Sequence, residues 1–228
     1  MTNKTIETLD LLKNKITEVG CGYLGKVLGT TSEMPLKILH IDHNPIGSKG
    51  VDGLANGLAQ NKTINVLTLS YGELDATCAP ALCKILIFIE SNLKELELIG
   101  NQLKGDGVAE ILPAVKISKN LISLDVSDNQ VEDNPKLKEA LADFAVNARN
   151  FQKINIGNNF LTNGFISQTM QALEEGKKIV DINFGIEISP ELRLKLKAIL
   201  TENKKVAKKA KKKKKKGKKG KKGKKAKK

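Results

Sequence analysis

Three glycines near the N-terminus are the first residues whose spacing suggests chemistry. Gly20, Gly22 and Gly25 fit a GxGxxG pattern, and Asp42 follows at a distance suited to a ribose hydroxyl. That pattern binds a dinucleotide when the glycines directly follow a strand. Here eight residues separate Gly20 from Leu11, where the expected strand ends. We therefore interpret these glycines as part of the architecture, and we expect no cofactor.

Both histidines of the chain, His40 and His43, flank Asp42. On a strand, His40 and Asp42 would point to the same face, which permits a weak metal site. A tight site needs three or four ligands, and the chain has no further histidine to complete one. The preferred interpretation is a group of polar residues on the solvent face of a sheet, without a metal.

The chain shows no motif for nucleophilic catalysis. Glu95 and Glu97 could act as paired acids, but their alternate positions are also those of a solvated strand. Cys21, Cys78 and Cys83 form neither a metal-ligand pair nor an even disulfide framework, so we expect them to be reduced. We expect a protein that is not an enzyme.

One pattern recurs seven times along the chain, with copies that begin at residues 6, 36, 64, 93, 121, 151 and 179. Its spacing of 28 to 30 residues is regular. Each copy alternates apolar residues as Leu-x-Leu, which is typical of a strand. Five copies then carry an asparagine: Asn14, Asn44, Asn101, Asn129 and Asn159. Gly72 and Glu187 replace it in the third and last copies, and we expect those two turns to be loosened.

The second half of each repeat has apolar residues four apart, which predicts a helix. Gly20, Gly50 and Gly107 share one position where the chain enters that helix. Each repeat therefore reads strand, turn, helix, and successive strands should pair in parallel. The fold class is α/β, a right-handed solenoid over residues 1–203. The helix residues expected to be buried against the sheet are Leu24, Leu54, Leu82 and Ile111.

This repeat resembles the leucine-rich repeats of the ribonuclease-inhibitor type, whose units of 28 or 29 residues contain a full helix. The resemblance covers roughly residues 6–200 and identifies the fold better than the function. Members of that class include ribonuclease inhibitor, tropomodulin, actin-regulatory scaffolds and the Ran GTPase-activating protein. The helix expected over 190–200 should close the C-terminal end. At the other end, either the first strand is exposed or the chain is the last part of a longer array.

The inward side chains of the strands and the residues around them should form a polar strip on the concave face. The last strand contributes either Asp181 or Asn183. Tyr71, flanked by Asp42 and Glu97, is the expected anchor, and the acids favour a basic partner. A solvated face without a partner is the alternative. The candidate protein-binding residues are Asp10, His40, Asp42, Thr68, Tyr71, Glu95, Glu97, Asp125, Asp128 and Asn155.

The charge of +14 averages two unlike regions. Residues 204–228 hold 18 of the 39 basic residues and no acid, which leaves 21 basic against 25 acidic residues in 1–203. A segment of Lys, Gly and Ala with little else predicts disorder. Without aromatics or arginine it should bind polyanions nonspecifically: RNA or the ribosome, acidic cytoskeletal tails such as those of tubulin, or anionic lipid. The candidate polyanion-binding residues are Lys208, Lys209, Lys211, Lys212, Lys213, Lys214, Lys215, Lys216, Lys218 and Lys219.

Together these features predict a scaffold that binds a protein on its concave face and a polyanion through its tail. The alternative is a small-GTPase regulator similar to the Ran-directed activators. That family uses an arginine of the array and ends in an acidic region, whereas Arg149 and Arg193 lie outside the strand positions and the tail is basic. No apolar stretch approaches the roughly 20 residues of a membrane span. The expected location is the cytoplasm, with the nucleus as the alternative.

Overall fold

The computed structural model describes residues 3–30, 34–148 and 151–225, and beyond Ala210 it describes only one side chain, that of Lys212. Strands and helices alternate along this part of the chain. The strands are β1 (Thr8–Asp10), β2 (Ile38–His40), β3 (Val66–Thr68), β4 (Glu95–Glu97), β5 (Ser123–Asp125), β6 (Lys153–Asn155) and β7 (Asp181–Asn183). The helices are α1 (Glu18–Thr30), α2 (Gly47–Leu58), α3 (Ala79–Ile87), α4 (Lys104–Ile117), α5 (Pro135–Asn147), α6 (Asn163–Gly176) and α7 (Pro190–Lys225), with a short 3-10 helix η1 (Ala76–Cys78) before α3.

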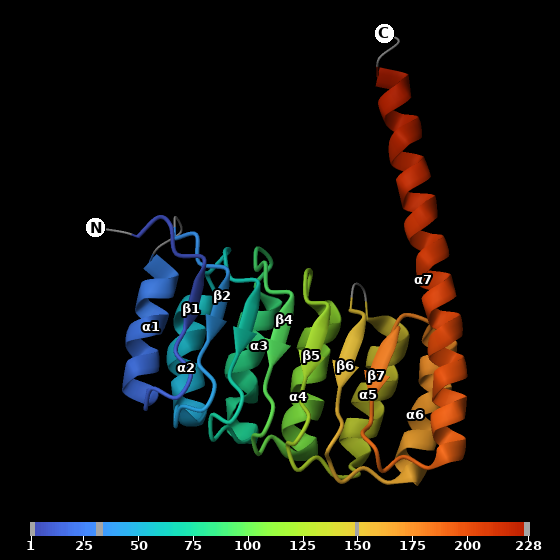
Figure 1. The fold of residues 1–228 in the computed structure, drawn as a ribbon, viewed down its shortest axis with the longest axis horizontal. Helices are drawn as coiled ribbons and strands as arrows, with labels where there is room; N and C mark the ends of the chain where they lie inside the picture. Colours follow the sequence, from blue (N-terminus) through green and yellow to red (C-terminus); the bar gives the residue numbers. More distant parts are fainter. Residues whose placement is uncertain (1–2, 31–33, 149–150, 226–228) are drawn as a thin grey trace.

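The strands form a single sheet in the order of the sequence, and every neighbouring pair is parallel. The register aligns equivalent residues of each repeat, so that Leu9 lies beside Leu39 and Leu39 beside Leu67. Strands occupy one side of the array and helices the other (Figure 1). This arrangement confirms the predicted solenoid of strand, turn and helix units.

The core lies between the sheet and the helices. The central residue of each strand from β2 to β7 is buried, and Leu54, Leu82 and Ile111 cover these residues from the helix side. Leu24 of α1 is only partly buried, contrary to the prediction. The reason is its position in the first repeat, since in the described part of the chain α1 packs against a neighbouring helix on one side alone.

In four repeats the asparagine of the repeated pattern joins its repeat to the one before it. The Asn101 side-chain oxygen accepts hydrogen bonds from the backbone N–H groups of Gly72 (2.9 Å) and Leu74 (3.1 Å). Its amide nitrogen donates to the carbonyls of Leu69 and Leu98. Asn44, Asn129 and Asn159 make equivalent contacts with the preceding repeat. The third turn is therefore held by Asn101, and the prediction that Gly72 loosens this turn is wrong.

Gly72 instead affects the second turn. An asparagine at position 72 would donate to and accept from that turn, as Asn101 does for the third turn, and Gly72 cannot. The Ile46 side chain fills that space: a β-carbon at position 72 would lie 3.2 Å from Ile46 Cγ1. The Ile46 N–H donates to the carbonyl of Asn44 (2.7 Å) in the absence of an amide acceptor. Apolar packing thus replaces a polar contact at this junction. In the last repeat, Glu187 is exposed.

Glycines on the facing sides of α1 and α2 permit close contact between these helices. A β-carbon on Gly25 would lie 2.0 Å from the Gly53 carbonyl oxygen, and one on Gly57 would lie 1.8 Å from the Gly25 carbonyl oxygen. Side chains at these positions would force the two backbones apart. Gly20, Gly22 and Gly25 all lie within α1, where a dinucleotide pattern would need a turn at the helix start. Helix packing explains Gly25 and Gly57.

Helix α7 covers the C-terminal end of the array, as the sequence predicts. Asn203 is buried, and its amide donates to the carbonyls of Leu173 (3.1 Å) and Ile179 (2.9 Å). The prediction of disorder from Lys204 onward differs from the structure, in which α7 continues to Lys225 (Figure 1). Lysine and alanine favour the helix, and the packed first turns of α7 supply the costly nucleus from which it extends.

Candidate functional site

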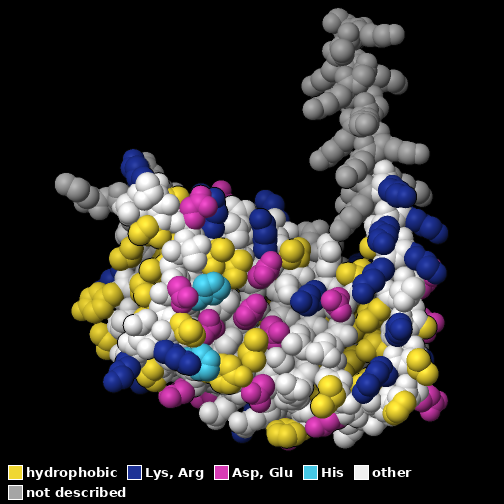
Figure 2. All heavy atoms as spheres, viewed as in Figure 1, with side chains coloured by type: hydrophobic (Ala, Val, Ile, Leu, Met, Phe, Trp, Pro, Cys, Tyr) yellow, Lys and Arg dark blue, Asp and Glu magenta, His cyan; other side chains and the backbone are white. Residues whose placement is uncertain are grey.

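The solvent side of the sheet presents two rows of side chains, called the sheet face here. The first row comprises Thr8, Ile38, Val66, Glu95, Ser123, Lys153 and Asp181. The second comprises Asp10, His40, Thr68, Glu97, Asp125, Asn155 and Asn183. The register therefore places Asn183, rather than Asp181, beside Asn155. Acidic side chains gather over the middle of this face, and both histidines lie beside them on the N-terminal side (Figure 2).

Asp42, just beyond β2, is fixed by the neighbouring repeat. Its carboxylate accepts hydrogen bonds from the Thr68 hydroxyl and from the Ser70 N–H (2.7 Å). His40 Nδ1 lies 2.9 Å from the same hydroxyl. Thr68 is only 2% exposed, so it positions Asp42 and His40 and is not itself available for contact, contrary to its place among the predicted binding residues.

Asp125 is fixed in a similar way three strands further along. Its carboxylate accepts hydrogen bonds from the Ser127 hydroxyl (2.6 Å) and from the Asn155 amide (2.8 Å). Asn183 in turn donates to the Asn155 side-chain oxygen (2.9 Å). Asn155 therefore links Asp125 to Asn183 by hydrogen bonds across three neighbouring strands. These bonds give the Asp125 carboxylate a defined orientation.

Glu97 lies between these two fixed acids and has no such support. Within the described residues its carboxylate accepts no hydrogen bond from the protein. Partial burial raises the pKa of Glu97, and the charges of Asp125, Asp42 and Glu95 raise it further. The nearby His40 acts in the opposite direction. The middle of the sheet face is thus an acidic cluster with too few donors, and a cation there would lower its energy.

A second feature borders this cluster, in the turn that follows the strands. The rings of His43 and Tyr71 are stacked, with centroids 4.4 Å apart and an angle of 11° between their planes. The other face of the Tyr71 ring lies against Gly100, because a β-carbon there would be 2.1 Å from Tyr71 Cε1. Tyr71 remains 44% exposed. Its edge and hydroxyl, rather than its ring faces, are available to a partner.

All three positions have left-handed backbone: φ is 54° at His43, 53° at Tyr71 and 66° at Gly100. Asp128, also left-handed, follows in the fifth repeat and is exposed. Sequence reasoning selected Tyr71 but not Gly100 or the supporting hydroxyl of Ser127. Alignment of the repeats could have identified Gly100 as a neighbour of Tyr71, since Gly100 occupies the position of Tyr71 one repeat later.

The remaining predicted residues are more dispersed. Asp10 lies on the edge strand, where its carboxylate accepts the Leu12 N–H (3.0 Å). Glu95 is exposed beside Glu97. Of the predicted polyanion-binding lysines, Lys208, Lys209 and Lys212 are exposed. The side chains of the others lie outside the described residues: Lys211, Lys213, Lys214, Lys215, Lys216, Lys218 and Lys219.

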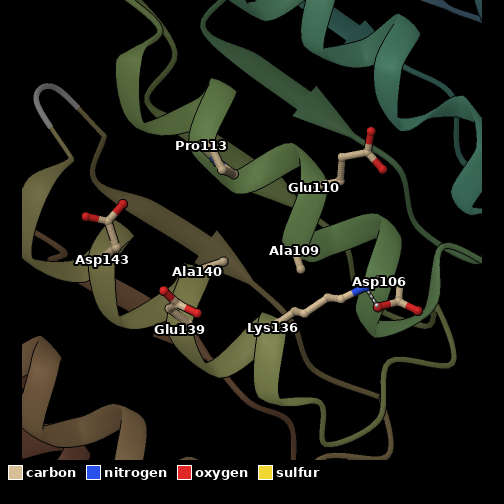
Figure 3. Close-up of a pocket in the computed structure, with 8 residues that line it drawn as sticks. All are labelled: Asp106, Ala109, Glu110, Pro113, Lys136, Glu139, Ala140 and Asp143. Atoms are coloured by element: carbon tan, nitrogen blue, oxygen red, sulfur yellow. Dashed lines mark ion pairs between the residues drawn. The ribbon is translucent and has the colours of Figure 1, made fainter.

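A groove of about 490 Å³ lies on the helix side, between α4 and α5 (Figure 3). Its floor is formed by small residues, and acids from both helices surround it. Lys136 pairs with Asp106 (3.7 Å), and Lys116 pairs with Asp143 (2.5 Å). Hydrogen bonds from Lys116 and Asn147 lower the pKa of Asp143. The chain's own lysines thus neutralise the charges of these two acids. A basic partner would therefore gain less electrostatic energy in this groove than on the sheet face.

The cysteines are unsuited to nucleophilic chemistry. Burial raises the pKa of Cys21 to about 11 and that of Cys78 to about 12, so both thiols stay protonated at neutral pH. In the described residues, no group of three His, Cys, Asp or Glu side chains has an arrangement that could hold a metal ion. No described helix combines the length and the apolar character needed to cross a membrane.

Comparison with known proteins agrees with this fold. A family model described as leucine-rich repeat matches residues 34–55 and 118–134. The ribonuclease inhibitor of Mus musculus is 29% identical over 163 residues, which cover 71% of this chain and 35% of that protein. The ribonuclease inhibitor of Sus scrofa is 33% identical over 108 residues, which cover 47% of this chain and 23% of that protein. The chain thus spans about a third or less of these relatives' length.

The tropomodulin C-terminal domain of Caenorhabditis elegans has a similar structure, with a TM-score of 0.52 and 15% identity over 82% of this chain and 95% of that domain. At this identity the likeness concerns the fold. The seven aligned repeats and these matches define a leucine-rich-repeat protein. Because each repeat runs 28 to 30 residues and carries a helix, the chain is a leucine-rich-repeat protein of the ribonuclease-inhibitor type.

Proposed function

We propose that this chain is a non-enzymatic scaffold that binds a protein through its sheet face. The observation that carries the proposal is Glu97, a partly buried carboxylate among three other acids, to which no side chain or backbone group of the described residues donates a hydrogen bond. A Lys or Arg side chain of a partner would supply that donor and offset the repulsion. The protein ligand implied by the name of the mouse ribonuclease inhibitor supports the same general role.

The surrounding geometry favours a protein over a small molecule. The polar rows run across seven strands, so contacts are spread over a long surface rather than gathered in a pocket. Asp42 and Asp125 are held by hydrogen bonds before any partner arrives, which reduces the entropy lost on binding. Tyr71 adds an aromatic edge with a hydroxyl beside the acids. Together they suit a basic protein surface.

A pulldown with the full chain, followed by calorimetry with the captured protein, tests this role. The double variant Tyr71→Ala/Glu97→Lys should weaken binding at least about 100-fold, the range of paired interface anchors. The matched control Glu139→Lys changes the same charge in the groove between α4 and α5. Equal affinity for the sheet-face variant and the unaltered protein would move the binding surface elsewhere.

The lysine-rich segment from Lys204 onward is proposed to attach the complex to a polyanion in the cytoplasm or nucleus. Among the described residues it buries no side chain after Asn203, whereas its exposed lysines carry a high positive charge. Residues 1–203 carry more acids than bases and should repel phosphate. Fluorescence anisotropy with a single-stranded RNA and flotation with phosphatidylserine vesicles would compare the full chain with residues 1–203.

Deletion of 204–228 should abolish binding to both probes, while the thermal unfolding midpoint stays nearly unchanged. Five simultaneous phosphate contacts with the single-stranded RNA would give a slope of about −3.5 in log affinity against log salt. Undiminished RNA binding by residues 1–203, or salt-independent binding by the full chain, would contradict this role.

Regulation of a small GTPase has weaker support. Of the two arginines, Arg149 lies outside the described residues. The Arg193 guanidinium donates to the carbonyls of Ile186 (2.7 Å) and Ile188 (3.3 Å) at the C-terminal end of the array. Those bonds engage Arg193 in closing the last loop, so it is poorly placed to reach a nucleotide.

A further inference from the structure

The array has two long edges that differ in charge. Loops that follow the helices lie along the upper edge in Figure 1, and turns that follow the strands lie along the lower edge. The charged side chains in the loops after α2, α3, α4 and α6 are all exposed and mostly basic: Lys62, Glu90, Lys94, Lys119, Lys177 and Lys178. The charged side chains in the turns after the strands are mostly acidic: Lys13, Lys15, Asp42, Glu73, Asp75, Asp128, Glu132, Asp133 and Glu187. The loops 59–65, 88–94, 118–122 and 177–180, with the helix ends that precede them, are called the basic edge here.

Hydrogen bonds between loops fix the middle of the basic edge. The Asn92 amide donates to the Lys62 carbonyl (2.6 Å), and the Asn120 amide donates to the Ser91 carbonyl (2.6 Å). The loops after α2, α3 and α4 therefore lie side by side. Together they present one continuous surface.

Isoleucines are exposed on this same part of the edge. Ile87 ends α3 and Ile117 ends α4, so the two occupy equivalent places in consecutive repeats. Ile89 lies in the loop between α3 and β4. Ile87 is 54% exposed, Ile89 73% and Ile117 51%. Apolar side chains grouped in this way among lysines mark an interaction surface.

The lysine-rich segment leaves the array at the basic edge. Helix α7 passes this edge and continues beyond the array on the same side (Figure 1). Lys204, Lys208, Lys209 and Lys212 are exposed on it. Figure 2 shows basic side chains along the upper edge and along α7 where it leaves the array. The segment therefore extends a surface that is already positive.

We propose that the basic edge and the lysine-rich segment together bind the surface of an anionic membrane. This inference rests on the proposed role of the segment and names its polyanion. The lysines would contact lipid headgroups, whereas Ile87, Ile89 and Ile117 would enter the boundary between headgroups and acyl chains. Stable attachment to a membrane needs two contributions, and the isoleucines add an apolar one to the charge of the lysines.

The isoleucines favour a membrane over RNA. A nucleic acid offers phosphates to lysines, and its bases stack on aromatic rings or on arginine. An aliphatic side chain has no comparable partner in RNA, but it gains free energy when its surface leaves water for hydrocarbon.

The two edges would also orient the array on the membrane. Anionic lipids attract the basic edge and repel the acidic turns at the opposite edge. Because the strands run from one edge to the other, the sheet would stand across the membrane plane (Figure 1). The sheet face would then remain open to its protein partner.

Fluorescence provides a direct test, because the chain contains no tryptophan. Ile89→Trp and Ile117→Trp each place a single reporter on the basic edge of the full chain. With vesicles of phosphatidylcholine and phosphatidylserine in equal amounts, the emission should shift to shorter wavelength. Lipids brominated on their acyl chains should quench it. Ile186→Trp is the matched control, since Ile186 is 84% exposed in the turn after β7 and its reporter should show neither change.

Affinity separates the membrane from RNA. The double variant Ile89→Ser/Ile117→Ser of the full chain should bind these vesicles at least about 10-fold more weakly, because two apolar contacts with lipid are lost. Its affinity for single-stranded RNA should stay within about 2-fold, since charge carries that binding. Ile186→Ser should alter neither affinity. Circular dichroism would establish that each variant is folded.

Two results would overturn the inference while leaving a role for the tail. One is vesicle binding that is indifferent to the isoleucine variants and leaves both tryptophans in water. The other is a full chain that binds RNA but not the vesicles. A full chain that binds neither probe would overturn the proposed role of the lysine-rich segment together with this inference.

Discussion

The Tyr71 ring is held between the His43 imidazole on one side and the Gly100 backbone on the other. This arrangement joins three consecutive repeats at one turn position. It fixes an aromatic side chain beside the acidic cluster without burying it. Tyr71 is thus oriented before any partner binds, which limits the conformational entropy that binding would cost.

Gly100→Ala should displace the Tyr71 ring and destabilise the fold by about 1–3 kcal/mol, because the new methyl group overlaps the ring. Its effect can be followed by the ring-current shifts of His43 in NMR spectra. Gly47→Ala is the matched control: φ at Gly47 is +60°, but no atom lies within 4 Å of its β-carbon position. An unchanged His43 spectrum in Gly100→Ala would contradict the stacking role of this glycine.

Asn101→Ala should destabilise the array by about 2–4 kcal/mol, since it leaves buried backbone groups of two repeats without partners. Urea unfolding monitored by circular dichroism measures the change. Asn56→Ala, on the exposed surface of α2, should have little effect. A loss from Asn101→Ala no larger than that of the control would show that water satisfies these groups.

Gly72→Asn would make the third repeat match the others in sequence, yet it should destabilise the protein by about 1–3 kcal/mol. The Ile46 side chain occupies the space that an asparagine would need, and the Leu69 carbonyl oxygen lies 3.0 Å from the added β-carbon. Thermal unfolding would measure the loss. A higher unfolding temperature of Gly72→Asn would mean that the Ile46 side chain can rearrange at little cost.

Glu97→Gln should stabilise the folded chain at neutral pH by roughly 0.2–1 kcal/mol, the range of like-charge contacts between strands. The folded-state pKa of Glu97 is raised above the ordinary value of 4.5, so its charge opposes folding once the pH exceeds the folded-state pKa. The advantage of the variant should therefore shrink as the pH falls through that pKa toward 4.5. Glu174→Gln, on the exposed surface of α6, should show no comparable trend across a pH series of urea unfolding curves.

The sequence predicted the fold because its strongest signal is a repeated one. Seven copies of Leu-x-Leu in one register specify the sheet, and apolar residues four apart specify the helices. The polar contacts were harder to predict. Asn101 accepts hydrogen bonds from Gly72 and Leu74 because its side chain faces the preceding repeat. The spacing of the repeats does not predict which neighbouring repeat the side chain faces.

The site was predicted in part for a related reason. Alternation along the strands identified Glu97 and Asp125 as surface positions, but it also included Thr68, whose hydroxyl turns toward Asp42 and becomes buried. Side-chain length and neighbouring partners decide such cases. Composition alone predicts disorder from Lys204 onward, because it does not take into account the packed turns of α7 that precede the lysines.

The backward direction of the asparagine contacts has a consequence for synthesis on the ribosome. Asn44 completes the turn that contains Asn14 and Ile16, and Asn101 completes the turn that contains Gly72 and Leu74. Each of these turns lacks its hydrogen-bond acceptor until about one further repeat has left the exit tunnel. The second turn receives no such amide, but its Gly47 N–H still depends on the Gly72 carbonyl of the following repeat (3.0 Å). A nascent array can therefore complete each of these turns only after the next repeat has emerged.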